Sequence, residues 1–172
     1  TNAEEKDYPA YYPNKRVAFE FNGESFGAFN KALEGYARET VQSLSYQPIP
    51  TVAKGYYEVG THKIVMNSRL TESEKAKTLI HELAHAKMHG ENSPYKDTTT
   101  REQEMQAEMT AYVVAKSFGL DPADESIHYV ANWTGKFAEI DDVERNLAAI
   151  QKTAREMIQG IDTHYGLELE KE

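Results

Sequence analysis

Apolar residues recur at intervals of three and four along most of the chain, which is the pattern of helices that bury one face. This spacing predicts helices over residues 25–44, 71–89, 101–118 and from 141 onward, with a shorter one over 125–133. The helix over 71–89 carries its own boundary signals, because Thr71 and Glu74 have capping-box spacing and Gly90 follows its last turn. The pattern therefore predicts a mainly helical protein.

Strand-forming residues are concentrated just before the second of these helices. Residues 55–59 and 63–67 are rich in β-branched and aromatic side chains and are separated by a short turn that contains Gly60, which predicts a β-hairpin. Residues 17–21 alternate apolar and polar side chains and predict one more short strand. The expected fold class is therefore α+β and mainly helical, with a small sheet or hairpin before the second helix.

The length of 172 residues suits one domain. Residues 1–14 mix tyrosine and proline with charges and predict an irregular N-terminal arm, which leaves 15–172 as a single domain. No apolar run approaches the roughly 20 residues that a membrane span needs. The first residues also lack the basic start and apolar core of a secretory signal, so we expect a cytoplasmic location.

Composition narrows the chemistry that the chain can support. Its 28 acidic and 19 basic residues give a formal net charge of −9, which argues against binding to a nucleic-acid backbone. The chain has no cysteine, so disulfides and thiolate-bound metals are excluded. A transition-metal site would have to use histidine, aspartate or glutamate.

One segment of the second helix has the composition of such a site. His81 and His85 are four residues apart, which places both imidazoles on one face of the helix, one turn apart. Two imidazoles so placed can bind one zinc ion, and Glu82 can act as general base toward a water that zinc activates. The apolar back of the same helix consists of Ala76, Leu79, Ile80, Leu83 and Ala84. The pattern predicts a zinc-dependent metallopeptidase, with a pair of surface histidines as the alternative.

A hydrolytic zinc site needs a third protein ligand. The metzincin pattern, with Gly and His downstream of the second histidine, fails because Met88 and Glu91 occupy those positions. His89 lies two turns from His81 on the same helix and is poorly placed to complete a tetrahedron. We expect His89 at the rim of the site, as a solvated histidine near the helix end.

The third helix offers two glutamates one turn apart. Glu104 follows His85 after 18 intervening residues, and Glu108 lies on the same helical face. We predict Glu104 as the third ligand and Glu108 as the hydrogen-bond partner of a ligating histidine. The reverse assignment and a solvated acidic face are the alternatives. Small residues beside the two glutamates would let the helices approach closely, and these are Ala107, Ala111 and Ala115.

Peptide hydrolysis also needs a donor for the negative charge that develops on the attacked carbonyl oxygen. Tyr112 lies on the face that carries Glu104 and Glu108, and we assign it this catalytic role, with packing in the core as the alternative. Tyr95, in the polar loop expected over 92–100, is the second choice.

The last helix carries a narrow apolar seam at alternating steps of three and four. Its members are Ile140, Val143, Leu147, Ile150, Ala154, Met157 and Ile161. Such a seam packs within a domain or forms a coiled-coil contact with a second copy. We therefore expect a monomer or a weak dimer.

The two segments around the expected site also resemble known proteins. Residues 78–87, with His81, Glu82 and His85, and residues 104–114, with Glu104, resemble the zincin-like peptidase domain of ArdC-type antirestriction proteins and of LtrC-like proteins of conjugative elements. They resemble the wider ImmA/IrrE peptidase family in the same way. The similarity covers about residues 71–157.

The resemblance implies a gluzincin-like fold, a Zn²⁺ cofactor, cleavage of a protein or peptide substrate, and a bacterial host. It implies His81, His85 and Glu104 as ligands and Glu82 as the base. ArdC-type proteins carry a separate domain that binds single-stranded DNA, and this chain has no basic segment of that kind, so we expect no nucleic-acid partner. The alternative function is a zinc-containing protein-binding or antirestriction module without proteolytic activity.

Overall fold

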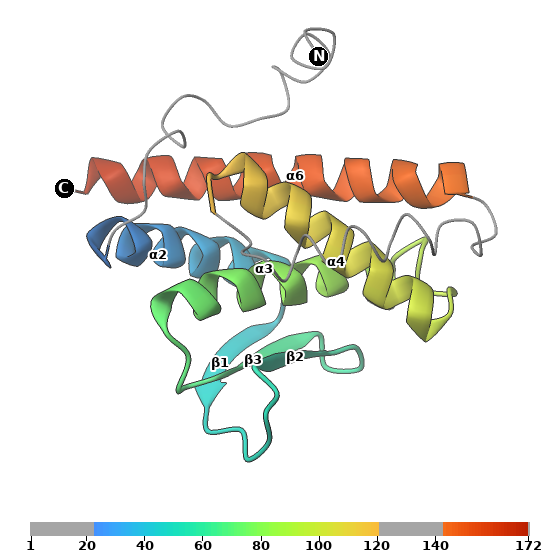
Figure 1. The fold of residues 1–172 in the computed structure, drawn as a ribbon, viewed down its shortest axis with the longest axis horizontal. Helices are drawn as coiled ribbons and strands as arrows, with labels where there is room; N and C mark the ends of the chain where they lie inside the picture. The colour runs from blue at the N-terminus through green and yellow to red at the C-terminus, as the bar shows by residue number, and fades with distance from the viewer. Residues whose placement is uncertain (1–22, 121–142, 172) are drawn as a thin grey trace, which may run out of the picture.

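The computed structural model describes residues 23–120 and 143–171, which form helices around a small sheet (Figure 1). In chain order the elements are α2 (Gly23–Thr40), β1 (Ser43–Gln47), β2 (Gly55–Glu58), β3 (Lys63–Asn67), α3 (Glu72–His89), α4 (Thr100–Ser117) and α6 (Val143–Glu170). The mainly helical α+β architecture is confirmed. The arm expected over 1–14, the strand over 17–21, the helix over 125–133 and the start of the last helix at 141 lie outside the described residues.

The sheet has three strands in the order β1-β3-β2, with β1 parallel and β2 antiparallel to β3. The predicted hairpin is confirmed as β2 and β3, which immediately precede α3. Strand β1 was not predicted: the first helix was expected to continue to residue 44, and it ends at Thr40. Leu44 fits a helical spacing and a strand spacing equally well. It packs with Tyr46 against the core, while the serines on either side of it point outward.

Helix α3, which carries the H-E-x-x-H segment, begins where the sequence predicts. The Thr71 hydroxyl accepts a hydrogen bond from the Glu74 backbone N–H at 3.2 Å, and the Glu74 carboxylate accepts one from the Thr71 N–H at 3.0 Å. The helix ends at His89, and Gly90 follows in extended backbone. Helix α4 begins with a second capping box, formed by Thr99 and Glu102. Both helices of the expected site therefore have fixed starting points.

The core lies between the four helices and extends to the face of the sheet that α3 covers. All five residues of the predicted apolar back of α3 are fully buried. On α6 the seam packs within the domain from Ile150 to Ile161, whereas Leu147 is 40% exposed. Helix α6 runs along the top of the view in Figure 1, and α2 packs below its C-terminal half. Helix α4 descends obliquely from the level of α6, and α3 packs against both α2 and α4 above the sheet. Among the described residues, no helix is both long enough and apolar enough to cross a membrane.

Candidate metal centre

The face of α3 opposite its apolar back carries the histidines and meets α4. His81 Nε2 and His85 Nε2 are 3.1 Å apart, and their rings stand nearly perpendicular at 77°. Glu104 reaches them from α4, with one carboxylate oxygen 3.1 Å from His85 Nε2 and the other 3.8 Å from His81 Nε2. The structure therefore brings together the three residues that the sequence predicts as ligands.

These three side chains have the donor chemistry and spacing that a zinc ion requires. Zinc with nitrogen and oxygen ligands at about 2.0–2.2 Å in a tetrahedron would hold the ligand atoms about 3.3–3.6 Å apart. The two imidazole nitrogens are 3.1 Å apart, and the two Glu104 oxygens lie 3.1 Å from His85 Nε2 and 3.8 Å from His81 Nε2, respectively, so each of these separations is close to that range. The Glu104 side chain is 56% exposed, so the cluster opens to solvent on one side. Two imidazoles and one carboxylate with an open side fit a hydrolytic zinc site.

Glu108 lies on the outer side of His81. One of its carboxylate oxygens is 3.1 Å from His81 Nδ1, the nitrogen that points away from Glu104. Burial opposes protonation of His81. The hydrogen bond that His81 donates to Glu108 and the negative charges of Glu108, Glu82 and Glu104 outweigh burial and raise the His81 pKa above its ordinary value. An acidic group at this place orients the ring so that Nε2 faces the other two side chains.

Glu82, the expected general base, is only 7% exposed. Burial raises the pKa of its carboxyl group, and the negative charges of Glu104 and Glu108 act in the same direction. The nearby His81 and His85 lower it, but the net shift is upward. A carboxylate with a raised pKa accepts a proton from water more readily than an exposed one, which is what general-base catalysis requires.

The prediction that His89 is a solvated rim residue is wrong. His89 is 4% exposed, and its Nδ1 lies 2.9 Å from His85 Nδ1. Its Nε2 lies 2.8 Å from the Gln106 side-chain oxygen on α4. Burial lowers the His89 pKa to about 4, against the opposing effect of the Gln106 hydrogen bond, so the ring is neutral near pH 7. The residue at the end of α3 is covered because α4 packs across it.

Two further residues of this region, Gln106 and Asn146, were not predicted from the sequence. The Gln106 amide nitrogen donates a hydrogen bond of 2.6 Å to the Asn146 side-chain oxygen on α6. The only sequence signal for Gln106 is a polar residue within the buried stretch of α4, and Asn146 lies 40 positions further along the chain.

Among the described residues, neither of the two tyrosines that the sequence offers as oxyanion donors forms a hydrogen bond to the histidine cluster. Tyr112 is half-buried on α4, one turn beyond Glu108, and among the described residues no hydrogen bond joins it to His81, His85 or Glu104. Tyr95 packs against a small apolar cluster with Met88 and Ile150. Its ring therefore has a structural role in the loop between α3 and α4.

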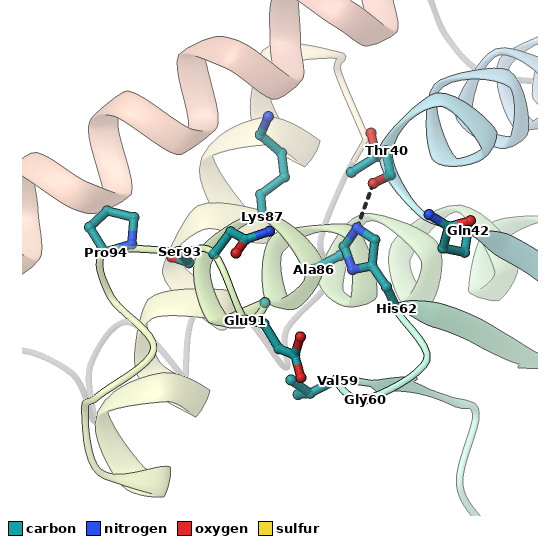
Figure 2. Close-up of a pocket in the computed structure, with 12 residues that line it drawn as sticks. Thr40, Gln42, Val59, Gly60, His62, Ala86, Lys87, Glu91, Ser93 and Pro94 are labelled. Atoms are coloured by element: carbon teal, nitrogen blue, oxygen red, sulfur yellow. Dashed lines mark hydrogen bonds between the residues drawn. The ribbon is translucent and has the colours of Figure 1, made fainter.

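A cavity of about 470 Å³ lies elsewhere, around the C-terminal end of α3 (Figure 2). It is lined by the end of α2, the β2–β3 turn and the residues that follow α3. His62 at its wall donates from Nε2 to the Thr40 carbonyl oxygen at 2.8 Å (Figure 2). Its Nδ1 lies 2.6 Å from the Tyr57 hydroxyl. None of the three clustered residues lines this cavity, so it is separate from the metal centre.

Comparisons with known proteins point to a peptidase family. Residues 24–130 match the family model Peptidase_M78, described as the IrrE N-terminal-like domain. The chain is 31% identical to an uncharacterized protein of Bacillus anthracis, in an alignment that covers 94% of this chain and 29% of that protein. The chain thus spans less than a third of the length of this relative. No solved structure gives a significant match.

Proposed function

Because this chain belongs to the IrrE N-terminal-like family of peptidases, we propose that it is a zinc-dependent metallopeptidase domain that hydrolyses peptide bonds of a protein substrate. In this proposal His81, His85 and Glu104 hold Zn²⁺, Glu108 orients His81, and Glu82 is the general base. The observation that carries the proposal is the cluster of two imidazoles and one carboxylate, whose ligand atoms all lie within 4.8 Å of one another.

The second support is the presence of a buried base beside a site that opens to solvent. A structural zinc site is closed by four protein ligands and needs no base, whereas a hydrolytic site keeps one position open. Among the described residues only three candidate ligands converge here, and Glu82 directly follows one of them, His81, in the sequence. The arrangement therefore favours a catalytic site over a structural one.

The proposed mechanism assigns a separate task to each side chain. Zinc, when bound, acidifies a water molecule and polarises the scissile carbonyl group. Glu82 removes a proton from the water and later delivers it to the leaving amine, so that the carboxylate is regenerated at the end of the cycle. Glu108 keeps the His81 imidazole oriented throughout. Tyr112 is the proposed oxyanion donor, a role that requires its hydroxyl to reach the substrate carbonyl oxygen.

The substrate class also belongs to this proposal. The similarity of residues 78–87 and 104–114 to ArdC-type and LtrC-like proteins favours a role within a conjugation or antirestriction protein of a bacterial mobile element. The net charge of −9 favours a protein or peptide partner over a nucleic acid.

Substituting Glu82 by Gln separates catalysis from metal binding. We expect Glu82→Gln to keep one zinc per chain and to lower cleavage of an unstructured peptide library by about 10²–10⁴-fold, the range for loss of a general base. Zinc is measured by inductively coupled plasma mass spectrometry and cleavage by mass spectrometry of the peptides. Glu91→Gln, the same change at an exposed glutamate outside the cluster, is the matched control and should leave both values unchanged.

Two other outcomes would contradict the peptidase proposal. A wild-type protein that binds one zinc but cleaves no peptide, and that keeps its biological effect as Glu82→Gln, is a zinc-containing binding or antirestriction module. A protein that takes up no zinc at all has no metal centre of the proposed kind.

A further inference from the structure

A continuous line of buried polar side chains leads from α6 through α4 to the histidine cluster on α3. Asn146 on α6 accepts from the Gln106 amide nitrogen at 2.6 Å, and the Gln106 oxygen lies 2.8 Å from His89 Nε2. His89 Nδ1 lies 2.9 Å from His85 Nδ1, and His85 Nε2 faces Glu104. Gln106, His89 and Asn146 are each 2–4% exposed, so water does not compete with these contacts.

The orientation of the Gln106 amide determines which atom is the donor and which the acceptor in each hydrogen bond of this line. The Gln106 nitrogen is used as a donor toward Asn146, so the Gln106 oxygen faces His89, and a carbonyl oxygen can only accept. His89 Nε2 must therefore carry a proton. A neutral imidazole with a proton on Nε2 has a bare Nδ1, which accepts a hydrogen bond from the proton on His85 Nδ1. His85 Nε2 is then left with a free lone pair.

We propose that Asn146, Gln106 and His89 form a relay that fixes the tautomer of His85, so that its Nε2 lone pair is presented to the metal. The inference rests on the proposed zinc site and extends it to residues outside the ligand set. His89 and Gln106 are positioning residues in this relay, since they act on the metal through His85 and touch neither metal nor substrate.

The opposite direction of the same line would disable the site. If the Gln106 nitrogen faced His89, the proton of His89 would move to Nδ1 and point at His85 Nδ1. The proton of a neutral His85 would then occupy Nε2, the atom that must bind zinc. The orientation in the structure, with the Gln106 amide nitrogen toward the Asn146 side-chain oxygen, is the one that leaves His85 Nε2 free for zinc.

The two ligating histidines therefore have different outer partners, and each partner accepts the proton on Nδ1 so that Nε2 is free for zinc. Glu108, which is 29% exposed at its side chain, accepts the outer proton of His81 as a charged group near solvent. Outside His85 the site is sealed, and an unpaired carboxylate there would carry a large desolvation cost. A neutral relay supplies the same acceptor without burying a charge, so it suits the covered side of the centre.

The first test reads the tautomers directly. Long-range ¹H–¹⁵N correlation spectra of the zinc-free and zinc-loaded protein distinguish a proton on Nδ1 from one on Nε2. We expect His89 to carry its proton on Nε2 in both states and zinc-loaded His85 to carry its proton on Nδ1. In the zinc-free protein Glu104 competes for a proton on His85 Nε2, so His89 is the decisive ring there. A proton on His89 Nδ1 would overturn the proposal.

The second test measures zinc affinity by competition with a chelator. Gln106→Met and His89→Leu should each weaken zinc binding by about 10–100-fold, the usual effect of losing an outer partner of a ligating histidine. His89→Asn restores an acceptor near the former Nδ1 and should recover most of that loss. Thr110→Val removes a buried hydrogen bond between the same two helices, to Met88, without touching the relay, and should change the affinity less than about threefold.

The outcomes separate the relay from the proposed function. Zinc binding with the expected tautomers but no peptide cleavage would support the relay and contradict the peptidase. If the protein binds no zinc, the spectrum of zinc-free His89 still decides whether the relay exists. Equal losses in Gln106→Met and Thr110→Val would show that general packing, and not the relay, controls zinc affinity, and would overturn the inference.

Discussion

The contact between α3 and α4 depends on polar side chains, whereas the contact between α2 and α6 depends on the packing of aromatic rings. Where α3 meets α4, histidine, glutamate and glutamine side chains meet in a fixed order of donors and acceptors. Where α2 meets α6, large rings fill the space between the helices: the Phe29 ring packs edge-on to the Tyr165 ring, and the Tyr36 ring lies against Gly160. In the first region the direction of each hydrogen bond matters, and in the second the volume of each side chain matters. The two should therefore respond to different substitutions.

The largest effect is expected from removing the carboxylate that α4 brings to the cluster. Glu104→Ala should weaken zinc binding by more than about 100-fold, beyond the range for an outer partner, whereas Glu108→Ala should weaken it by about 10–100-fold. The Glu104 side chain is 56% exposed, so the stability of the zinc-free protein should change by no more than about 0.5 kcal/mol. Chelator competition and thermal unfolding without zinc measure the two quantities.

The reverse order of these two variants would contradict the assignment. If Glu108→Ala lost more zinc than Glu104→Ala, Glu108 would be the ligand and Glu104 its partner. Equal and small losses in both would mean that the acidic pair on α4 is a solvated surface.

The matching change in the other region adds a single methyl group. A Cβ at Gly160 would lie 2.2 Å from the Tyr36 ring, a contact that the two packed helices must relieve by moving. Gly160→Ala should therefore destabilise the protein by about 1–3 kcal/mol, as overpacking does in other cores. For a domain of this size that lowers Tm by roughly 2–4 °C per kcal/mol. Zinc affinity should stay the same.

Gly27→Ala is the control, because a Cβ at Gly27 on α2 meets nothing within 4 Å. This change should stabilise the protein by about 0.4–1 kcal/mol through the lower chain entropy of the unfolded state and better helix propensity. Loss of stability in Gly27→Ala as well would show that the effect of Gly160→Ala does not come from the contact with the Tyr36 ring alone. Loss of zinc affinity in Gly160→Ala would show that the two regions are coupled.

The comparison also shows which features the sequence could predict. Capping boxes, the β2–β3 hairpin and the spacing of His81 and His85 are set by neighbours within a few positions, and local rules identify them. Strand β1 was mistaken for the tail of a helix because Leu44 satisfies both periods. Its actual state depends on pairing with β3, about 20 positions further on.

His89, Gln106 and Asn146 illustrate what the sequence alone leaves open. His89 ends a helix, where histidine is normally solvated, and only the packing of α4 and α6 covers it. The contacts that decide its environment join residues 17 and 40 positions apart. The sequence also leaves open the close approach of Gly160 to Tyr36, because a glycine within a helix does not indicate which ring will lie against it.

The smallest predicted change in stability concerns the capping box at the start of α3. This helix packs against α4 on one side and against α2 on the other. Glu74 belongs to the capping box, and its pKa is lowered by the hydrogen bonds from the Thr71 backbone and side chain, with a weaker contribution from Lys54. A carboxyl group whose pKa is lower in the folded state stabilises the fold above its unfolded pKa. That contribution is lost as the pH falls through the folded value.

Glu74→Gln keeps the capping-box geometry but removes the charge. We expect it to lower stability by about 0.5 kcal/mol or less at pH 7, because the carboxylate lies near solvent at the N-terminus of the helix. The difference from wild type should close as the pH falls below the ordinary value of 4.5, which denaturant unfolding at a series of pH values measures. Zinc affinity should not change, because His81 lies about 15 Å along the helix from Thr71. A gap that persists at low pH would show that Glu74 acts through packing and not through its charge.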